Sequence, residues 1–426
     1  MSLGIRMANG NTQGEVVLAA DGTPLKESLN KAMRKNRIRA LMLVAPLFIF
    51  ILFSFLIPIL DMTFRSVDNW QVGTLMPNTS MALKDWDGKA IPEEPVFEAL
   101  IADLKAGAIT REIGKVGTRL NYEKSGMRSM ITSSARKSKK VKEGPYKPIV
   151  LKMHKKWKDL ETWTVIKRNT SAYTIGYYLN AVDLKINKSG EIVRQPENRQ
   201  IYGKLFLRTF AISMAITIIC IILAYPISYL LATMPLRYSN LLMIFVLLPF
   251  WTSLLVRTTA WIAMLQSQGV LNDLFVFFGF IDDANRLQLI YNLTGTIIAM
   301  THILLPFMVL PLYSVMKTIP PTYMRAALSL GANPFVAFVR VYMPQTLSGI
   351  GAGSILVFIL SIGYYITPAL VGGTGGTLIS NQIAYHMQSS LNWGLAGALG
   401  ALLLGSVLAL YTLYNKIVGI DNMKLG

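Results

Sequence analysis

Residue types that commonly carry covalent chemistry or bind metal ions are few and scattered in this 426-residue chain. Its histidines, His154, His302 and His386, are far apart and lack the short spacing of metal ligands. Its single cysteine, Cys220, lies inside an apolar run and can form no intrachain disulfide. We therefore predict no catalytic residue, no metal site and no cofactor.

A glycine-rich stretch at residues 372–377 could suggest a phosphate-binding loop. It reads Gly-Gly-Thr-Gly-Gly-Thr and lacks the lysine of the G-x-x-x-x-G-K-[ST] pattern. We interpret it as a flexible loop. Because that pattern occurs nowhere in the chain, any ATP hydrolysis that drives this protein must take place on a separate subunit.

The segment from Pro320 to Pro344 has the start and stop signals of two short helices. Consecutive prolines fix φ for a first helix, and Gly331 can end that helix in the left-handed conformation. Asn333 then caps a second helix that has Pro334 in its first position, and Pro344 breaks it. The spacing alone is equally compatible with an ordinary helical connector.

Aromatic residues in the apolar part of the chain could bind a cation. They are Phe250, Trp251, Tyr364 and Tyr365, which would be candidates for a translocation pathway if the chain transports a solute. An ammonium group over such a ring gains about 0.5–2 kcal/mol, which suffices for a low-affinity transit site. Helix packing or an aromatic belt at the membrane interface explains the same residues equally well.

Arg257 is the one charge expected deep in the apolar part of the chain. It could line the pathway, or it could pair with carbonyl groups and hold helices together. We favour the second use, because a buried cation repels a cationic ligand. His302 is expected to form a hydrogen bond between helices rather than to bind a ligand.

Six apolar runs predict six membrane crossings, since a spanning helix needs about 20 apolar residues. The runs are 40–60, 205–232, 241–265, 290–316, 346–371 and 395–418, and none contains Asp or Glu. Carriers coupled to protons or sodium usually keep carboxylates in their spans, so the absence of Asp and Glu from these runs argues against a carrier of that class. Basic residues at 31–39 place the amino terminus in the cytoplasm, and six spans return the carboxyl terminus there.

The polar residues 61–203 form an insert between the first two runs, and we predict that it is a mixed α+β extracytoplasmic domain. A helix is expected at 92–107, where Val96, Leu100 and Leu104 share one face, and another at 111–136. Two strands are expected within 173–193, around the turn composition of residues 187–190.

The insert is strongly basic, with 15 Lys and Arg against four Asp and Glu in residues 119–168. Interleaved with these charges are Tyr122, Tyr146, Trp157 and Trp163, which are residue types favoured as interface anchors. A dock for an acidic binding protein, a contact with anionic lipids and a merely solvated surface are the open alternatives. We expect no nucleic acid partner, because the chain has no base-stacking platform or DNA-reading motif.

The sequence therefore predicts a membrane protein with an all-α six-span transmembrane bundle and the insert between spans 1 and 2. The expected parts are a cytoplasmic segment at 1–39, a first transmembrane helix at 40–60, the insert at 61–203 and a five-helix core at 204–420. A short helical segment at 320–333 belongs to the core.

One pattern in this segment resembles that of a known family. Arg325-Ala326-Ala327-x-x-x-Gly331 is followed after nine residues by Val341-x-Met343-Pro344. Inner-membrane components of binding-protein-dependent ABC importers carry the similar pattern E-A-A-x-x-x-G and I-x-L-P with the same spacing. Here Arg325 replaces the family's Glu, which leaves open whether one polar contact is kept.

In that family the loop is a coupling helix that sits in a cleft of the ATPase subunit. The resemblance implies a set of ATPase-coupling residues, namely Tyr323, Met324, Arg325, Ala326, Ala327, Gly331, Ala332 and Pro344. The stretches 248–253, 256–258, 305–313 and 365–370 are similar to the spermidine/putrescine-type branch. The resemblance covers roughly residues 203–420 and implies a multi-pass protein of the bacterial inner membrane.

The implied partners are the lipid bilayer, an ABC ATPase dimer, a second permease in a heterodimer and a periplasmic substrate-binding protein. The implied function is ATP-driven import of a small polar, polyamine-like cation, without covalent chemistry by this chain. The same machine could instead import opines, amino-acid derivatives or quaternary amines. A membrane-anchored receptor with 61–203 as its sensor is the alternative from another class, although no inside segment after residue 39 is long enough for a signalling domain.

Overall fold

The computed structural model describes residues 25–187 and 190–418, with side chains for residues 33–187 and 190–416. It divides into two units, Met1–Asp61 and Met62–Gly426. Residues 1–24 of the expected amino-terminal segment and two residues of the turn at 187–190 lie outside the described part.

The first unit is helical. It contains α1 (Leu25–Ile51), the π-helical turn η1 (Leu52–Leu56) and the beginning of α2 (Ile57–Arg65). Met33–Arg65 is long and apolar enough to cross a membrane. The expected first transmembrane helix, at 40–60, lies inside this range.

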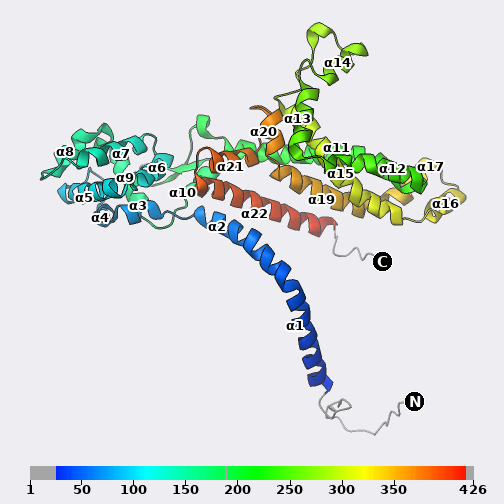
Figure 1. Ribbon diagram of the computed structural model, residues 1–426, viewed down its shortest axis with the longest axis horizontal. Coiled ribbons are helices and arrows are strands. Elements are labelled where there is room, and N and C mark those ends of the chain that lie inside the picture. Colours follow the sequence, from blue (N-terminus) through cyan, green and yellow to red (C-terminus); the bar gives the residue numbers. More distant parts are fainter. Residues whose placement is uncertain (1–24, 188–189, 419–426) are drawn as a thin grey trace. The chain divides into compact units, whose positions relative to one another are not determined.

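The centre of the second unit is a bundle of long helices (Figure 1). These helices are α11 (Tyr202–Thr233), α15 (Leu293–Thr318), α19 (Leu347–Gly363) and α22 (Trp393–Val418). Cys220, Met300 and Met308 belong to the buried core that α11, α15 and α19 share. A Cβ atom at Gly349 would lie 3.1 Å from the Cα atom of Leu312, so glycine lets α19 approach α15 closely.

Two further segments are apolar enough to span a membrane but are bent. The first comprises α12 (Leu236–Leu247), η4 (Leu248–Trp251), α13 (Leu254–Leu265) and α14 (Val270–Phe277). Its two halves meet at 100°. The second comprises α17 (Pro334–Ala337), η6 (Phe338–Tyr342), α18 (Met343–Gln345) and α19, with a bend of 59°. The described residues thus provide four membrane-spanning helices, or up to six if each bent pair is one span.

Short helices connect these segments. They are η5 (Asp283–Asn285), α16 (Thr322–Ser329), α20 (Ile366–Val371) and α21 (Ile379–Gln388). The helical membrane bundle predicted from the six apolar runs is confirmed at this level of detail.

The insert is helical, so the prediction of a mixed α+β domain is wrong. Its helices are α3 (Trp70–Leu75), α4 (Pro77–Ala82), α5 (Glu94–Thr110), α6 (Ile113–Glu123), α7 (Met127–Ser138), α8 (Tyr146–Met153), η2 (Lys155–Lys158), α9 (Leu160–Arg168), α10 (Gly176–Ala181) and η3 (Glu197–Arg199). Within the described residues the only sheet pairs β1 (Leu184–Ile186) with β2 (Ile192–Arg194) in antiparallel register. Two three-residue strands cannot bury a sheet face, so the helices supply the core.

The two tryptophans expected to anchor an interface are instead fully buried in the core of the insert. The Trp157 and Trp163 rings lie 5.0 Å apart, and Phe97 contacts the second ring at 4.9 Å. Each indole N–H finds an internal acceptor, Ser134 Oγ for Trp157 and the Trp157 carbonyl for Trp163, both at 2.9 Å. These satisfied N–H groups make burial of the large rings favourable.

The helix predicted at 92–107 is present as α5, and its face of Val96, Leu100 and Leu104 is buried as expected. The helix predicted at 111–136 is divided into α6 and α7. Gly126 adopts φ +81° between them, a conformation that glycine takes without strain.

A buried ion-pair network ties together distant parts of the insert. Arg119 is only 3% exposed, and its guanidinium donates to Asn69 Oδ1 at 2.6 Å and to Glu123 Oε1 at 3.1 Å. It also lies 4.7 Å from the centre of the Tyr177 ring. Arg168 forms a second ion pair with Glu123. Burial raises the pKa of the Glu123 carboxyl, but the two guanidinium groups outweigh burial and hold that pKa below its ordinary value.

The two ends of residues 70–170, the main part of the insert, lie next to each other in space. Asp68 forms an isolated antiparallel bridge with Tyr173. The Asn69 backbone N–H donates to the Ala172 carbonyl at 2.9 Å, and its side chain donates to the Ser171 carbonyl at 2.9 Å. Residues 70–170 therefore leave the rest of the chain and return to it at almost the same place.

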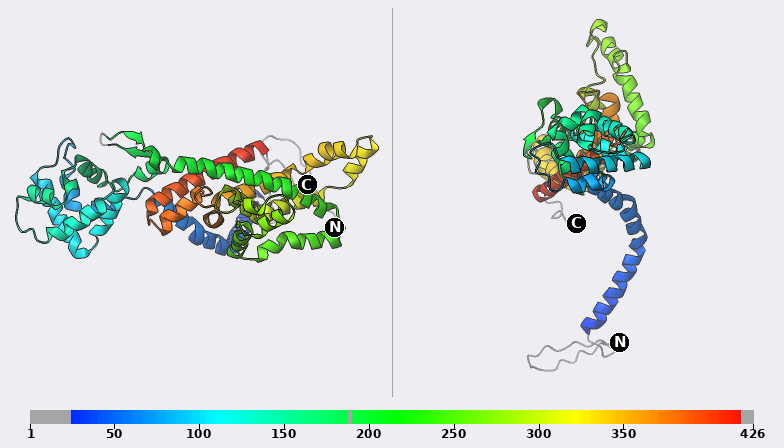
Figure 2. Two further views of the ribbon diagram at one scale, coloured as in Figure 1. Left: turned by 90° about the horizontal axis from the view of Figure 1, so that it is seen from above. Right: turned by 90° about the vertical axis from the view of Figure 1, so that its left-hand side faces the viewer.

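The insert joins the bundle mainly through α10, which packs on the start of α22. A Cβ atom at Gly394 would lie 2.4 Å from the Tyr177 ring, so only glycine permits this approach. Within this unit the insert lies at one end of the bundle and α16 at the other (Figure 1 and Figure 2).

Candidate functional site

The segment with the family-like pattern folds as two short helices joined by a tight turn. Helix α16 ends at Ser329, and Gly331 follows with φ +90°. The Ala332 N–H donates to the Ala327 carbonyl at 3.1 Å, and the Gly331 N–H donates to the Leu328 carbonyl at 3.0 Å. These two bonds form a Schellman motif, which explains why glycine occupies position 331.

The second helix begins as the sequence predicts. The Asn333 side chain accepts a hydrogen bond from the Val336 N–H at 2.8 Å, and Pro334 occupies the first position of α17. Pro344 lies in α18, just before the 59° bend to α19. The predicted cap and the predicted break before the fifth span are thus both present.

One side of α16 is fixed to the bundle by an aromatic cluster. Met324 packs against a cluster whose buried members are Leu312, Met316 and Tyr342. Tyr225 and Tyr229 of α11 and Phe338 of η6 pack against the same cluster. The ring centre of Tyr229 lies 5.5 Å from that of Phe338 and 5.4 Å from that of Tyr342, and both pairs are edge to face. The cluster thus joins α16, α11 and the helix that leads into α19.

The other side of this segment exposes apolar side chains. Leu330 is 89% exposed, Phe335 is 75% exposed, and Tyr323 and Ala326 are also exposed. Ala327 and Ala332 are half-buried, whereas Arg325 is exposed. A projecting, mostly apolar surface on an anchored helix pair is what a protein partner would cover.

The pathway candidates fall into two groups on two broken helices. Phe250 and Trp251 end η4, and the Phe250 ring lies 4.8 Å from that of Phe307 on α15. Tyr364 and Tyr365 lie at the break between α19 and α20. Trp251 and Tyr365 are exposed, whereas Tyr364 packs against the bundle core.

Helix α21, which the sequence reasoning missed, supports the break at Tyr364 and Tyr365. The Ser380 hydroxyl donates to the Tyr364 carbonyl at 2.6 Å, and the Asn381 amide donates to the Tyr365 carbonyl at 2.7 Å. Asn381 Oδ1 also accepts from the Leu378 N–H at 2.9 Å. The polar run Ser-Asn-Gln at 380–382, between apolar residues, was the available signal.

We predict that Asn381→Ala lowers the stability of the purified chain by about 1–2 kcal/mol, because it leaves the Tyr365 carbonyl and the Leu378 N–H without their partner. The measurement is the thermal unfolding midpoint. Gln382→Ala is the matched control, since Gln382 makes no side-chain hydrogen bond with any described residue. Equal midpoints for the two variants would refute a supporting role for Asn381.

The glycine-rich loop at 372–377 is packed against the bundle, which differs from the flexible loop expected. The Tyr291 N–H donates to the Val371 carbonyl at 2.7 Å, and a Cβ atom at Gly373 would lie 2.4 Å from the Tyr291 carbonyl oxygen. The Arg208 guanidinium donates to the Gly375 carbonyl at 3.1 Å. The glycines therefore serve close backbone approach.

His302 forms the predicted hydrogen bond between helices, accepting at Nδ1 from the Trp261 indole at 3.1 Å. Arg257 was expected to pair with carbonyl groups, but its buried Nε has no hydrogen-bond partner among the described residues. His302 also borders a cavity of about 320 Å³. Its other walls are apolar, with Leu242, Phe245 and Leu305 among them, so it offers little to a polar solute.

Comparison with known proteins places these features in a family. Residues 224–418 match the family described as "Binding-protein-dependent transport system inner membrane component". The chain is 31% identical to the spermidine/putrescine transport system permease protein PotB of Escherichia coli (strain K12), over 52% of this chain and 82% of that protein.

Two other relatives agree with this match. PotB of Haemophilus influenzae is 32% identical over 51% of this chain and 77% of that protein. The inner membrane ABC transporter permease protein YdcU of Escherichia coli (strain K12) is 33% identical over 50% of this chain and 71% of that protein. With its membrane-spanning helices and its Arg325–Pro344 pattern, the chain belongs to the inner-membrane components of binding-protein-dependent transport systems and is a multi-pass, inner-membrane permease subunit of an ABC importer.

Proposed function

We propose that the chain is one of two permease subunits of an ATP-driven importer for a small polyamine-like cation. The observation that carries this proposal is the 31% identity to PotB, a spermidine/putrescine permease, over 82% of its length. ATP hydrolysis belongs to a separate ATPase dimer in this scheme, and a periplasmic binding protein delivers the solute.

We assign ATPase coupling to the segment at 320–333. Its support is the combination of an anchored side, through Met324, and an exposed side with Ala326 and Leu330. Movement of the ATPase subunits would push on this segment and, through Tyr229 and Tyr342, on the bundle. Arg325 offers a cation where the family has a carboxylate, so the ATPase contact at this position differs in charge.

The arrangement of the second unit supports an orientation in the membrane. If α16 faces the cytoplasmic ATPase, the insert at the other end of the bundle is extracytoplasmic (Figure 1). Helix α22 starts at the insert end, where Gly394 contacts Tyr177. Its final turn therefore lies toward the cytoplasm, in agreement with six spans and cytoplasmic termini.

A second permease and lipid are the proposed neighbours of the outlying segment α13–α14. This segment projects from the bundle (Figure 1), and Phe277 at its end and Phe278 and Phe280 just after it are exposed. The pathway we propose lies between the two permeases, with the aromatic rings of Phe250, Tyr364 and Tyr365 as weak cation sites.

The decisive experiment is uptake by proteoliposomes that contain the chain with its own ATPase subunits, second permease and binding protein. We expect ATP-dependent uptake of labelled putrescine or spermidine, with the other of the two as an effective competitor. Octopine, glycine betaine and an amino acid serve as parallel substrates. Saturable uptake of one of these in place of the polyamines would contradict the assigned solute and leave the importer assignment intact.

A further inference from the structure

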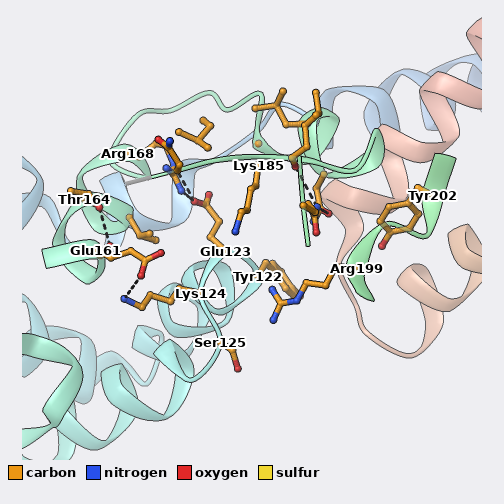
Figure 3. A pocket seen from close by; sticks show the side chains of 18 of the residues that line it. Tyr122, Glu123, Lys124, Ser125, Glu161, Thr164, Arg168, Lys185, Arg199 and Tyr202 are labelled. Carbon is orange, nitrogen blue, oxygen red and sulfur yellow. Dashed lines mark hydrogen bonds and ion pairs between the residues drawn. The ribbon is translucent and has the colours of Figure 1, made fainter. Parts of the chain in front are cut away.

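A polar cavity of about 770 Å³ lies where the insert meets the start of α11. Its walls come from the end of α6, from α9 and α10, from the β1–β2 hairpin and from η3 (Figure 3). The cavity is separate from the coupling segment and from the aromatic pathway residues. Its volume is typical of small-molecule sites.

The cavity carries an excess of positive charge. The cations that line it are Lys124, Lys156, Arg168, Lys185 and Arg199, and the acids are Glu123 and Glu161. Both acids are already paired: Glu123 with Arg168, and Glu161 with Lys124 at 3.1 Å. Three cations therefore have no carboxylate partner among the described residues.

Two of these three cations are free to bind a ligand. Lys156 donates to the Ser125 carbonyl. Lys185 and Arg199 are exposed residues, and their side chains form neither a hydrogen bond nor an ion pair with any residue in the described part of the chain. Both side chains extend into the cavity (Figure 3).

We propose that this cavity binds a small multivalent oxyanion, either a di- or tricarboxylate or a phosphate compound. Like charges gathered in a concave site raise the local concentration of anions. The planar fork of Arg199 suits bidentate binding of a carboxylate or a phosphate, and the ammonium groups of Lys156 and Lys185 add point charges. The same field repels a polyamine, so this site is distinct from the proposed transport pathway.

A ligand here would touch the joint between the insert and the bundle. Tyr122 and Tyr202 both line the cavity. The Tyr122 hydroxyl donates to the Leu391 carbonyl at 3.3 Å, and the Tyr202 hydroxyl is hydrogen-bonded to His386 Nε2 at 2.9 Å. Because these contacts reach α21 and the turn before α22, a bound anion would stabilise the joint and raise the unfolding temperature.

The test titrates the purified full chain with citrate and, separately, with inorganic phosphate, following heat of binding and thermal unfolding midpoint. Sodium chloride at equal ionic strength controls for screening. We expect saturable binding of at least one anion with a raised midpoint. Binding of citrate alone indicates a carboxylate ligand, and binding of phosphate alone indicates a phosphate ligand.

The double variant Lys185→Gln, Arg199→Gln should weaken that binding about tenfold or more, since two charge-assisted contacts are lost. The control Arg194→Gln, Lys204→Gln removes the same charge from exposed positions nearby that do not line the cavity. This control should bind as the unaltered chain does. The site does not exist if neither anion raises the midpoint more than chloride does, or if the two double variants bind the anion equally. Neither result decides the proposed transport function, because polyamine uptake is measured in a separate experiment.

Discussion

Replacing Ala326 by Asp is expected to abolish ATP-driven uptake, by at least about 100-fold, while the chain still inserts and pairs with its fellow permease. Ala326 lies two residues after Met324, about 200° around the helix from the side that packs on the bundle. It is exposed in the chain, so the substitution leaves the fold intact. Burying an uncompensated carboxylate against the ATPase costs several kcal/mol, and about 1.4 kcal/mol is a factor of ten in binding.

The measurements are solute uptake, binding-protein-stimulated ATP hydrolysis and co-purification with the ATPase. Ala326→Ser is the matched control, because it adds a small neutral hydroxyl at the same position and should retain most activity. Ala327 is a less clean site for this test, since it is half-buried. Normal uptake by Ala326→Asp would show that the ATPase does not cover this face of α16.

Glu123→Gln is expected to destabilise the insert by about 3 kcal/mol, because it removes the carboxylate that compensates the buried Arg119. Unfolding in denaturant is measured through the fluorescence of the tryptophans, which include the buried pair Trp157 and Trp163. Glu112→Gln is the control. The Glu112–Lys115 pair is 44% and 54% exposed, so its loss should cost less than about 1 kcal/mol.

The same network predicts a dependence of stability on pH. The pKa of Glu123 is lower in the folded chain than its ordinary value. Its contribution to the free energy of unfolding is therefore complete above the ordinary pKa of a glutamate and is lost as the pH falls through the folded value. The unaltered chain should lose stability on acidification more steeply than Glu123→Gln does; parallel curves would contradict the assigned ion pairs.

The sequence predicted the parts of the fold that hydrophobic periodicity controls. The runs at 205–232, 290–316 and 395–418 correspond to α11, α15 and α22, and Leu100 and Leu104 mark the buried face of α5. Cap and stop signals near Gly331 and Asn333 also predicted the helix ends, because these residues act through local backbone bonds.

Features that depend on distant contacts could not be predicted in this way. A hydropathy average does not detect the helix breaks at Trp251 and at Tyr364, since the residues on both sides of each break are apolar. The support of the second break by Ser380 and Asn381 requires α21 to fold back on it. Trp163 looked like a surface anchor because its burial depends on Phe97, more than sixty residues away in the chain.

The adjacency of Asp68 and Tyr173 bears on how such a chain could arise. A domain whose two ends meet can enter a host protein at a single junction without moving the host's helices, because the host chain continues almost where it left off. The family match at 224–418 begins well after this junction. Residues 70–170 therefore have the architecture of an acquired module, one that natural selection could lengthen, exchange or delete while the transport machinery behind it stayed the same.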